Sequence, residues 1–215
     1  MSIELIIFDL DGTLIDSKID ITNALNYAME PYSQGRLTPE DAVKLIGEGI
    51  TRLIEKLVGG RGETVRADVA SRFLRHYTDH LVDYTKEYPG VKETLEKLGG
   101  YRKAVISNKR ESLSKKVLDG LGLARYFDIV IGSDTTPERK PSPVPVLKAL
   151  SELKVEPDGA VMVGDSNYDI DAGKAAGVAT VAVTYGYRPR EVIAHADYLI
   201  DRINDLVPLL EKINR

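Results

Sequence analysis

The sequence predicts an α/β fold in which a doubly wound parallel sheet carries a helical subdomain inserted after its first strand. An apolar run at residues 3–8, rich in β-branched and aromatic side chains, indicates a buried strand that ends in Asp9 and Asp11. Apolar residues then recur at helical spacing as far as residue 85. From Tyr88 onward, short apolar runs alternate with amphipathic segments, which is typical of a parallel sheet covered by helices on both faces.

Length and composition narrow the class of protein. A chain of 215 residues favours one core with a sizeable insertion. The net charge of −4 and the lack of any Lys/Arg block argue against nucleic acid and acidic membranes as partners. With no cysteine, disulfides, thiolate nucleophiles and Cys-type zinc sites are excluded. No leader pattern and no apolar run of about 20 residues is present, so we expect a cytoplasmic protein.

The inserted subdomain is expected over residues 16–86, with residues 1–15 and 87–215 forming the core. Connections between a strand and its following helix usually span about 2 to 6 residues, so this long helical stretch cannot be an ordinary loop. Three helices are expected from apolar residues three or four positions apart. They carry Ile19, Ile21, Leu25 and Ala28; then Ile50, Leu53, Ile54, Leu57 and Val58; and last Val69, Phe73, Tyr77, Leu81 and Tyr84.

The core elements follow from the alternating pattern. Strands are expected at residues 103–106, 129–131, 160–163, 180–183 and 198–200, and helices near 91–99, 111–120, 143–153, 168–176 and 204–213. Polar clusters follow three of these strands, namely Ser107-Asn108-Lys109, Lys140-Pro141 and Gly164 to Asp169. In a parallel sheet these clusters converge on the edge that carries Asp9 and Asp11.

The residue types at that edge predict phosphoryl chemistry. Carboxylates about 4 Å apart repel by about 4 kcal/mol per pair at an effective dielectric of about 20, so the site needs a cation. Magnesium fits oxygen ligands, and neither Cys nor clustered His is available for zinc. Ser107 and Lys140 can hold phosphoryl oxygens. Asp9 would be the nucleophile, and Asp11 would protonate the leaving oxygen and later deprotonate water.

These clusters resemble the four ordered motifs of the haloacid dehalogenase superfamily. The matching stretches are Asp9-Leu10-Asp11-Gly12-Thr13-Leu14, Ser107-Asn108, Lys140-Pro141 and Gly164-Asp165-Ser166-x-x-Asp169. The resemblance implies the Rossmann-like core of that superfamily, a mobile cap and Mg²⁺. It makes Asp9 and Asp165 metal ligands, adds the backbone carbonyl of Asp11, and gives Asp169 a supporting role beside the metal or Lys140. An aspartate two residues after the nucleophile points to the phosphatase branch.

A finer resemblance is to the phosphoglycolate phosphatase-like members. It rests on Ile46-Gly47-Glu48-Gly49-Ile50, Tyr88-Pro89-Gly90-Val91, Ser107-Asn108-Lys109 and Val183 to Arg188. The expected function is hydrolysis of a small phosphate monoester, 2-phosphoglycolate first, through an aspartyl-phosphate. Phosphate-binding residues would be Ser107, Asn108 and Lys140, with Gly47, Glu48, Gly49 and Lys109 contributing to specificity. We expect a monomer or homodimer with a small-molecule partner.

Several alternatives stay open. Within the superfamily they are pyrophosphatase, sugar-phosphate phosphatase and phosphomutase. A phospho-receiver module also groups acidic residues, a hydroxyl and a lysine, but Asp11 would shorten the life of its phospho-form. His76 and His80 lie one helical turn apart without an evident third ligand, which favours surface residues. Lys109 and Arg188 could contact substrate or solvent.

Overall fold

The computed structural model describes residues 2–32 and 35–215. Residues 1, 33 and 34, which fall inside the expected core and insertion, lie outside the described residues. The chain forms two compact units. One comprises Met1–Ile15 and Glu87–Arg215, and the other comprises Asp16–Lys86.

The first unit contains a six-stranded sheet in which every pair of neighbours is parallel. Its order is β5-β4-β1-β6-β7-β8. The strands are β1 (Leu5–Phe8), β4 (Arg102–Ile106), β5 (Ile129–Ile131), β6 (Ala160–Gly164), β7 (Ala179–Val183) and β8 (Tyr198–Ile200). The predicted fold class is confirmed, because buried, β-branched runs pair here as parallel strands with both faces covered.

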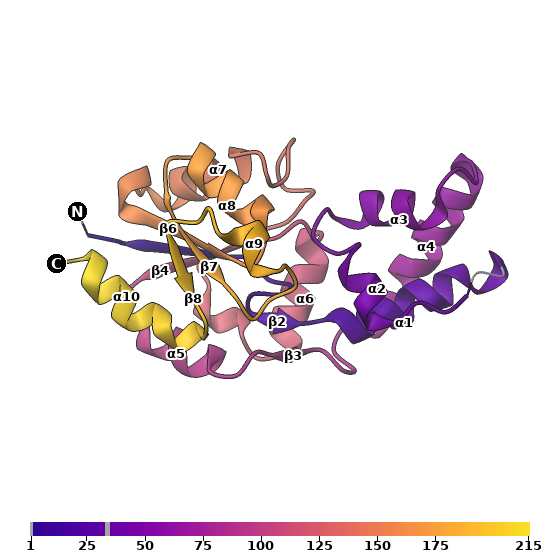
Figure 1. Cartoon of the computed structure of the whole chain (residues 1–215), viewed down its shortest axis with the longest axis horizontal. Coiled ribbons are helices and arrows are strands. Elements are labelled where there is room, and N and C mark those ends of the chain that lie inside the picture. The colour runs from indigo at the N-terminus through magenta and orange to yellow at the C-terminus, as the bar shows by residue number, and fades with distance from the viewer. Residues whose placement is uncertain (1, 33–34) are drawn as a thin grey trace. The chain divides into compact units, whose positions relative to one another are not determined.

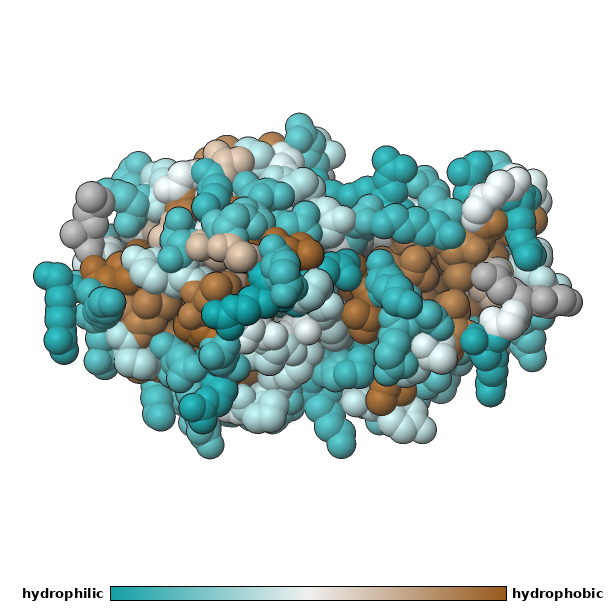
Figure 2. All heavy atoms as spheres, in the orientation of Figure 1, coloured by the Kyte–Doolittle hydropathy of each residue, from teal (hydrophilic) through white to brown (hydrophobic). Residues whose placement is uncertain are grey.

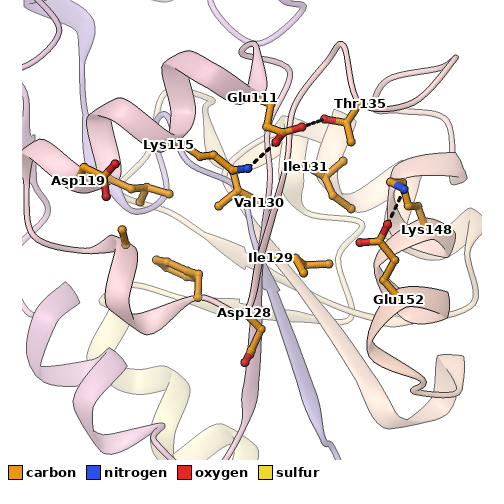
Figure 3. A pocket seen from close by; sticks show the side chains of 13 residues that line it. Glu111, Lys115, Asp119, Asp128, Ile129, Val130, Ile131, Thr135, Lys148 and Glu152 are labelled. Carbon is orange, nitrogen blue, oxygen red and sulfur yellow. Dashed lines mark hydrogen bonds and ion pairs between the residues drawn. The ribbon is translucent and has the colours of Figure 1, made fainter.

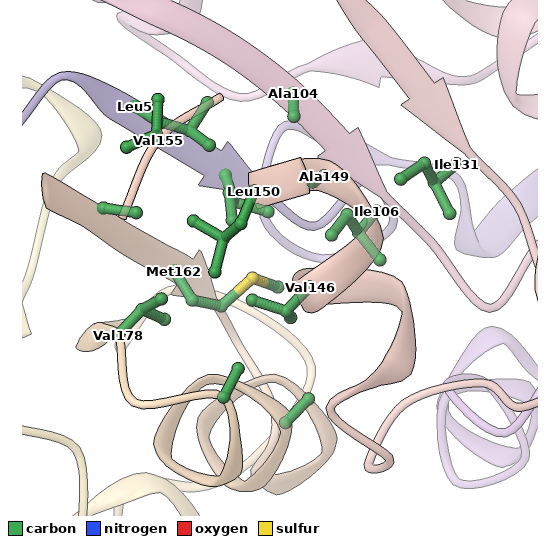
Figure 4. Close-up of a cluster of buried hydrophobic side chains, with 14 residues drawn as sticks. Leu5, Ala104, Ile106, Ile131, Val146, Ala149, Leu150, Val155, Met162 and Val178 are labelled. Carbon is green, nitrogen blue, oxygen red and sulfur yellow. The ribbon is translucent and has the colours of Figure 1, made fainter. Parts of the chain in front are cut away.

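Helices cover both faces of this sheet (Figure 1). They are α5 (Val91–Lys97), α6 (Glu111–Gly120), α7 (Val144–Leu153), α8 (Asn167–Ala175), α9 (Arg190–Ile193) and α10 (Leu206–Ile213). Helices α7 and α8 bury their apolar sides against one face, where Val146 and Leu150 meet Leu5, Ile106 and Met162 (Figure 4). Helices α5 and α10 lie together on the other side. The α9 helix was not predicted, since four residues are too few to display a helical period.

The strand order places a reversal of direction at β1. From β1 the chain moves outward to β4 and β5, and then returns to the other side of β1 to form β6, β7 and β8. In open α/β sheets, ligands bind in the crevice outside the carboxyl ends of the strands at such a reversal. The carboxyl end of β1 is Phe8, directly followed by Asp9.

The second unit is mostly helical. Its elements are α1 (Lys18–Met29), the 3₁₀ helix η1 (Glu30–Tyr32), α2 (Pro39–Val43), α3 (Ile50–Val58) and α4 (Glu63–Asp79). Two short strands, β2 (Ile15–Asp16) and β3 (Lys86–Glu87), pair where the chain passes between the units. The α2 helix was not predicted. It begins at a capping box in which Thr38 and Asp41 satisfy each other's backbone N–H groups.

The end of α4 differs from the expectation. The predicted apolar stripe included Leu81 and Tyr84, but α4 ends at Asp79, and Tyr84 is 58% exposed. The buried carboxylate of Asp20 accepts the backbone N–H groups of Tyr84 at 3.0 Å and of Thr85 at 2.8 Å. These two hydrogen bonds anchor the segment that follows α4 to α1.

Hydrophilic side chains cover most of the face seen in Figure 2, with apolar side chains confined to scattered patches. No helix in the described ranges is long and apolar enough to cross a membrane.

Candidate active site

Asp9 lies at the carboxyl end of β1, where its backbone N–H donates to the carbonyl of Val163 at 2.9 Å. The Nζ atom of Lys140 donates to Asp9 Oδ1 at 2.7 Å and to Asp169 Oδ1 at 2.6 Å. It also donates to the carbonyl of Ile106, the last residue of β4. The lysine side chain is 2% exposed, so its charge acts on these partners with little solvent screening. One ammonium group thereby joins the carboxyl ends of β1 and β4 to the first turn of α8.

Asp165 is held on both oxygens by neighbouring loops. The backbone N–H of Tyr187 donates to Oδ2 at 2.6 Å, and the hydroxyl of Thr13 donates to Oδ1 at 3.5 Å. A Cβ atom on Gly186 would lie 2.2 Å from Asp165 Cβ and 2.6 Å from the carbonyl oxygen of Gly12. Only glycine therefore lets the loop after β7 approach this carboxylate so closely.

Three of these supporting residues were not predicted as site residues. Thr13 sits inside the Asp-x-Asp-Gly-Thr motif, so the motif itself carried a signal for it. Gly186 and Tyr187 act through backbone atoms and close approach, which residue type alone does not reveal. The Tyr185 hydroxyl donates to the carbonyl of Thr13 at 2.8 Å and so anchors the same loop.

Burial and mutual repulsion disfavour the ionised forms of Asp9 and Asp165. Burial above all, together with the charge of Asp169, raises the pKa of Asp9 to about 7 against the opposing effect of Lys140. Burial, followed by the charges of Asp9 and Asp169, raises the pKa of Asp165 well above its ordinary value. Burial alone would lower the pKa of Lys140, but the charges of Asp169 and Asp9 outweigh it and the pKa lies above the ordinary value.

This donor set fits a hard divalent cation. Oxygens of Asp9, Asp165 and Asp169 lie within 4.8 Å of one another, and all three residues are buried. Both oxygens of Asp169 already accept hydrogen bonds, one from Lys140 and the other from Ser166 N and Oγ at 3.0 and 2.7 Å. The oxygens of Asp165 also accept hydrogen bonds, from Tyr187 N and the Thr13 hydroxyl, so the assignment of ligand and supporting roles among the three carboxylates stays a prediction. Carboxylate oxygens are the ligands that Mg²⁺ prefers.

We expect Mg²⁺ to stabilise the protein more at about pH 8 than at about pH 5.5. Because the pKa of Asp9 is raised in the folded state, its favourable contribution is present at low pH and is lost as the pH rises through about 7. A cation that binds the ionised carboxylates reverses this loss. At about 100 times its Kd it adds about 2.7 kcal/mol, or roughly 5 to 10 °C in Tm for a chain of this size. Thermal melts with Mg²⁺ and with a chelator check this. An equal Mg²⁺ effect at both pH values would contradict it.

Asp11 and Lys109 form a second ion pair beside the first. Lys109 Nζ lies 2.6 Å from Asp11 Oδ1, and the two side chains are 7% and 10% exposed. Asp11 is not one of the three clustered carboxylates, but its charge acts on Asp9 and helps to raise the pKa of that residue. The metal contact expected of Asp11 is through its backbone carbonyl and stays a prediction.

Ser107 and Asn108 lie in the turn that follows β4. The hydroxyl of Ser107 accepts the backbone N–H of Lys109 at 3.2 Å, and the side-chain amide of Asn108 donates to the carbonyl of Lys140 at 3.0 Å. Asn108 therefore ties the loop that carries Lys140 to the end of β4. Phosphate binding by these residues stays a prediction.

The expected specificity residues divide between the units. Lys109 belongs to the unit that contains the sheet, whereas Gly47, Glu48 and Gly49 belong to residues 16–86. Gly49 is the N-cap of α3. Glu48 forms an ion pair with Lys56 of that helix. Contact between this turn and a substrate stays a prediction.

Two other features carry less chemistry. A hollow of about 470 Å³ lies against the edge strand β5 between α6 and α7 (Figure 3), and both of its lysines are paired, Lys115 with Glu111 and Lys148 with Glu152. The rings of His76 and His80 pack together with centroids 4.4 Å apart. Neither histidine belongs to a group of three close metal ligands within the described ranges.

Comparison with known proteins agrees with this geometry. A family model described as "Haloacid dehalogenase-like hydrolase" matches residues 6–183. A phosphoglycolate phosphatase of Aquifex aeolicus is 44% identical over 209 residues, covering 96% of each chain. One from Chromobacterium violaceum is 36% identical over 97% of each chain. The crystal structure of a predicted phosphoglycolate phosphatase from Haemophilus somnus superimposes with a TM-score of 0.89 at 29% identity, covering 97% of this chain and 98% of that one.

The resemblance inferred from the motifs is therefore confirmed. The matched range begins inside β1 and ends at the last residue of β7, so it includes Asp9, Lys140 and Asp165 together. The chain belongs to the haloacid dehalogenase-like hydrolase family, as an enzyme whose relatives are phosphoglycolate phosphatases.

Proposed function

We propose that this protein is a magnesium-dependent phosphatase that hydrolyses a small phosphate monoester through a phosphorylated Asp9. The observation that carries the proposal is the arrangement around Asp9. A buried carboxylate at a strand end contacts a fully buried lysine, and two more buried carboxylates lie within metal-binding distance. Such a set can bring a negatively charged phosphate to a negatively charged nucleophile, because the lysine and a cation compensate the charge.

Two displacements would complete the reaction. An oxygen of Asp9 attacks phosphorus, the bond from phosphorus to the ester oxygen breaks, and Asp11 gives its proton to the departing alcohol. Asp11 then takes a proton from water, the water oxygen attacks phosphorus, and the bond to Asp9 breaks to release inorganic phosphate. When bound, Mg²⁺ would screen the carboxylates and polarise the phosphoryl group. Lys140 holds Asp9 in place throughout.

We propose 2-phosphoglycolate as the substrate, because the relatives named above carry that activity in their names and align over nearly the whole chain. Residues 16–86 would form the cap that excludes bulk water and selects the leaving alcohol. Within it, the turn formed by Gly47, Glu48 and Gly49 is the proposed specificity element. We also propose a cytoplasmic enzyme that acts as a monomer or homodimer.

A panel of phosphate esters tests the substrate. We expect kcat/KM for 2-phosphoglycolate to exceed that for p-nitrophenyl phosphate, pyrophosphate and sugar phosphates by about tenfold or more, and chelation of Mg²⁺ to remove the activity. A specific site distinguishes substrates by contacts to the leaving group, and each missing polar contact costs about 1 to 3 kcal/mol. A higher kcat/KM for pyrophosphate or a sugar phosphate would overturn the substrate but keep the phosphatase. Failure of every ester to turn over would overturn both.

A further inference from the structure

The structure contains two buried lysines beside four carboxylates, and each lysine has separate partners. Lys140 contacts Asp9 and Asp169, whereas Lys109 contacts Asp11. The remaining carboxylate, Asp165, accepts hydrogen bonds from Tyr187 N and the Thr13 hydroxyl. The charge of Lys109 is therefore directed at Asp11 rather than at the nucleophile.

The main chain of Lys109 is fixed on both sides. Its N–H donates to the hydroxyl of Ser107 at 3.2 Å, and its carbonyl accepts the N–H of Ser133 at 2.9 Å. Ser107 itself is tied to the sheet, since its N–H donates to the carbonyl of Ile131 at 3.0 Å. The ammonium group thus extends from a turn anchored to β5, and it reaches Asp11 across 98 positions of the sequence.

We propose that Lys109 is a positioning residue for Asp11, orienting its carboxylate for proton transfer and balancing the charge left when the proton moves to the leaving alcohol. This inference rests on the proposed function, because it assigns Lys109 to the proton-transfer step of that reaction. A charge-assisted hydrogen bond of 2.6 Å between side chains at most 10% exposed fixes geometry more firmly than a solvated pair does. Placement of a proton donor to within hydrogen-bond reach is what general acid catalysis requires.

This role has a consequence that a direct phosphate-binding role would not share. The leaving group of an alkyl phosphate is a strongly basic alkoxide, so it needs the proton from Asp11 while the bond to phosphorus breaks. The leaving group of p-nitrophenyl phosphate is a weak base and needs almost no proton. Loss of Lys109 should therefore harm alkyl phosphates selectively, whereas loss of a phosphate-binding lysine would harm both substrates alike.

The first experiment compares Lys109→Met with the wild type on the best alkyl phosphate and on p-nitrophenyl phosphate. Methionine keeps the unbranched side chain and removes the charge. We expect kcat/KM to fall about 30-fold or more for the alkyl ester and less than about threefold for the aryl ester, within the range of general acid effects. Lys109→Arg should restore part of the alkyl activity because it keeps a donor. Lys115→Met, which removes a 54% exposed lysine on α6, is the matched control and should change neither substrate.

The second experiment repeats Lys109→Met in an Asp11→Asn background. If Lys109 acts through Asp11, the double variant should be no slower than Asp11→Asn alone, within about twofold. An equal loss on both esters, or an undiminished effect in the Asp11→Asn background, would overturn the inference. If Asp11→Asn itself fails to discriminate between the esters, the proposed acid role of Asp11 is wrong. If it discriminates and Lys109→Met does not, only the role of Lys109 is wrong.

Discussion

Asp9→Asn is expected to abolish turnover while leaving the protein folded. The amide cannot attack phosphorus, and loss of a covalent nucleophile costs on the order of 10⁴- to 10⁶-fold in kcat. The Mg²⁺-free protein should melt at the same temperature or higher at about pH 8. The reason is that burial and Asp169 raise the pKa of Asp9 to about 7, so the ionised carboxylate is costly there and a neutral amide is not.

Two measurements check this result, steady-state turnover on the preferred ester and thermal melts in a chelating buffer. Trapping of labelled phosphate on the protein adds a direct readout, since acid-quenched wild type should retain label and Asp9→Asn should not. Activity within tenfold of the wild type would contradict the mechanism. A large drop in Tm would show instead that Asp9 is needed for the fold.

Lys140→Met is expected to damage both stability and activity. The substitution leaves the carboxylates of Asp9 and Asp169 buried without their shared cation, and breaking a buried ion pair by removing one partner costs about 3–5 kcal/mol. Turnover should fall about 10³-fold or more, because the nucleophile loses the donor that lies 2.7 Å from it. Chemical denaturation at about pH 8 measures the first effect and steady-state kinetics the second.

The controls for Lys140→Met separate charge from packing. The stability loss should shrink at about pH 5, where Asp9 becomes protonated, and also in the double variant with Asp9→Asn, which removes one of the two stranded charges. Lys115→Met removes a lysine from an exposed ion pair and should cost less than about 1 kcal/mol. A loss for Lys140→Met as small as that of Lys115→Met would contradict the role of the buried ammonium group.

The core of the fold was predictable because the burial of each strand and helix leaves a pattern in its own short stretch of sequence. Strands buried on both faces are continuous apolar runs, as in β6, and every predicted core strand agrees with the structure within two residues. The prediction was wrong at the end of α4. The predicted apolar stripe continued to Tyr84, yet α4 ends at Asp79, and the backbone N–H of Tyr84 donates to Asp20, 64 positions away.

For the site too, the residues could be predicted from the sequence but their contacts could not. Asp9, Asp11, Lys140 and Asp165 follow apolar strands, and parallel pairing brings strand ends to one edge, so the amino-acid order alone determined that they would meet. The hydrogen-bond and ion-pair partners of these residues could not be predicted from strand order. The sequence is silent on which lysine faces which carboxylate, and on the approach of Gly186 to within contact of Asp165.

The fold class, the family and the carboxylates and lysines of the site follow from the amino-acid order, because they depend on short-range patterns and on the order of the strands. The distribution of charge in that site, with Lys140 paired to Asp9 and Asp169 and Lys109 paired to Asp11, emerges from the three-dimensional fold. The physical reason is that hydrogen-bond pairing and pKa depend on distances of a few ångströms between residues that lie far apart in the chain.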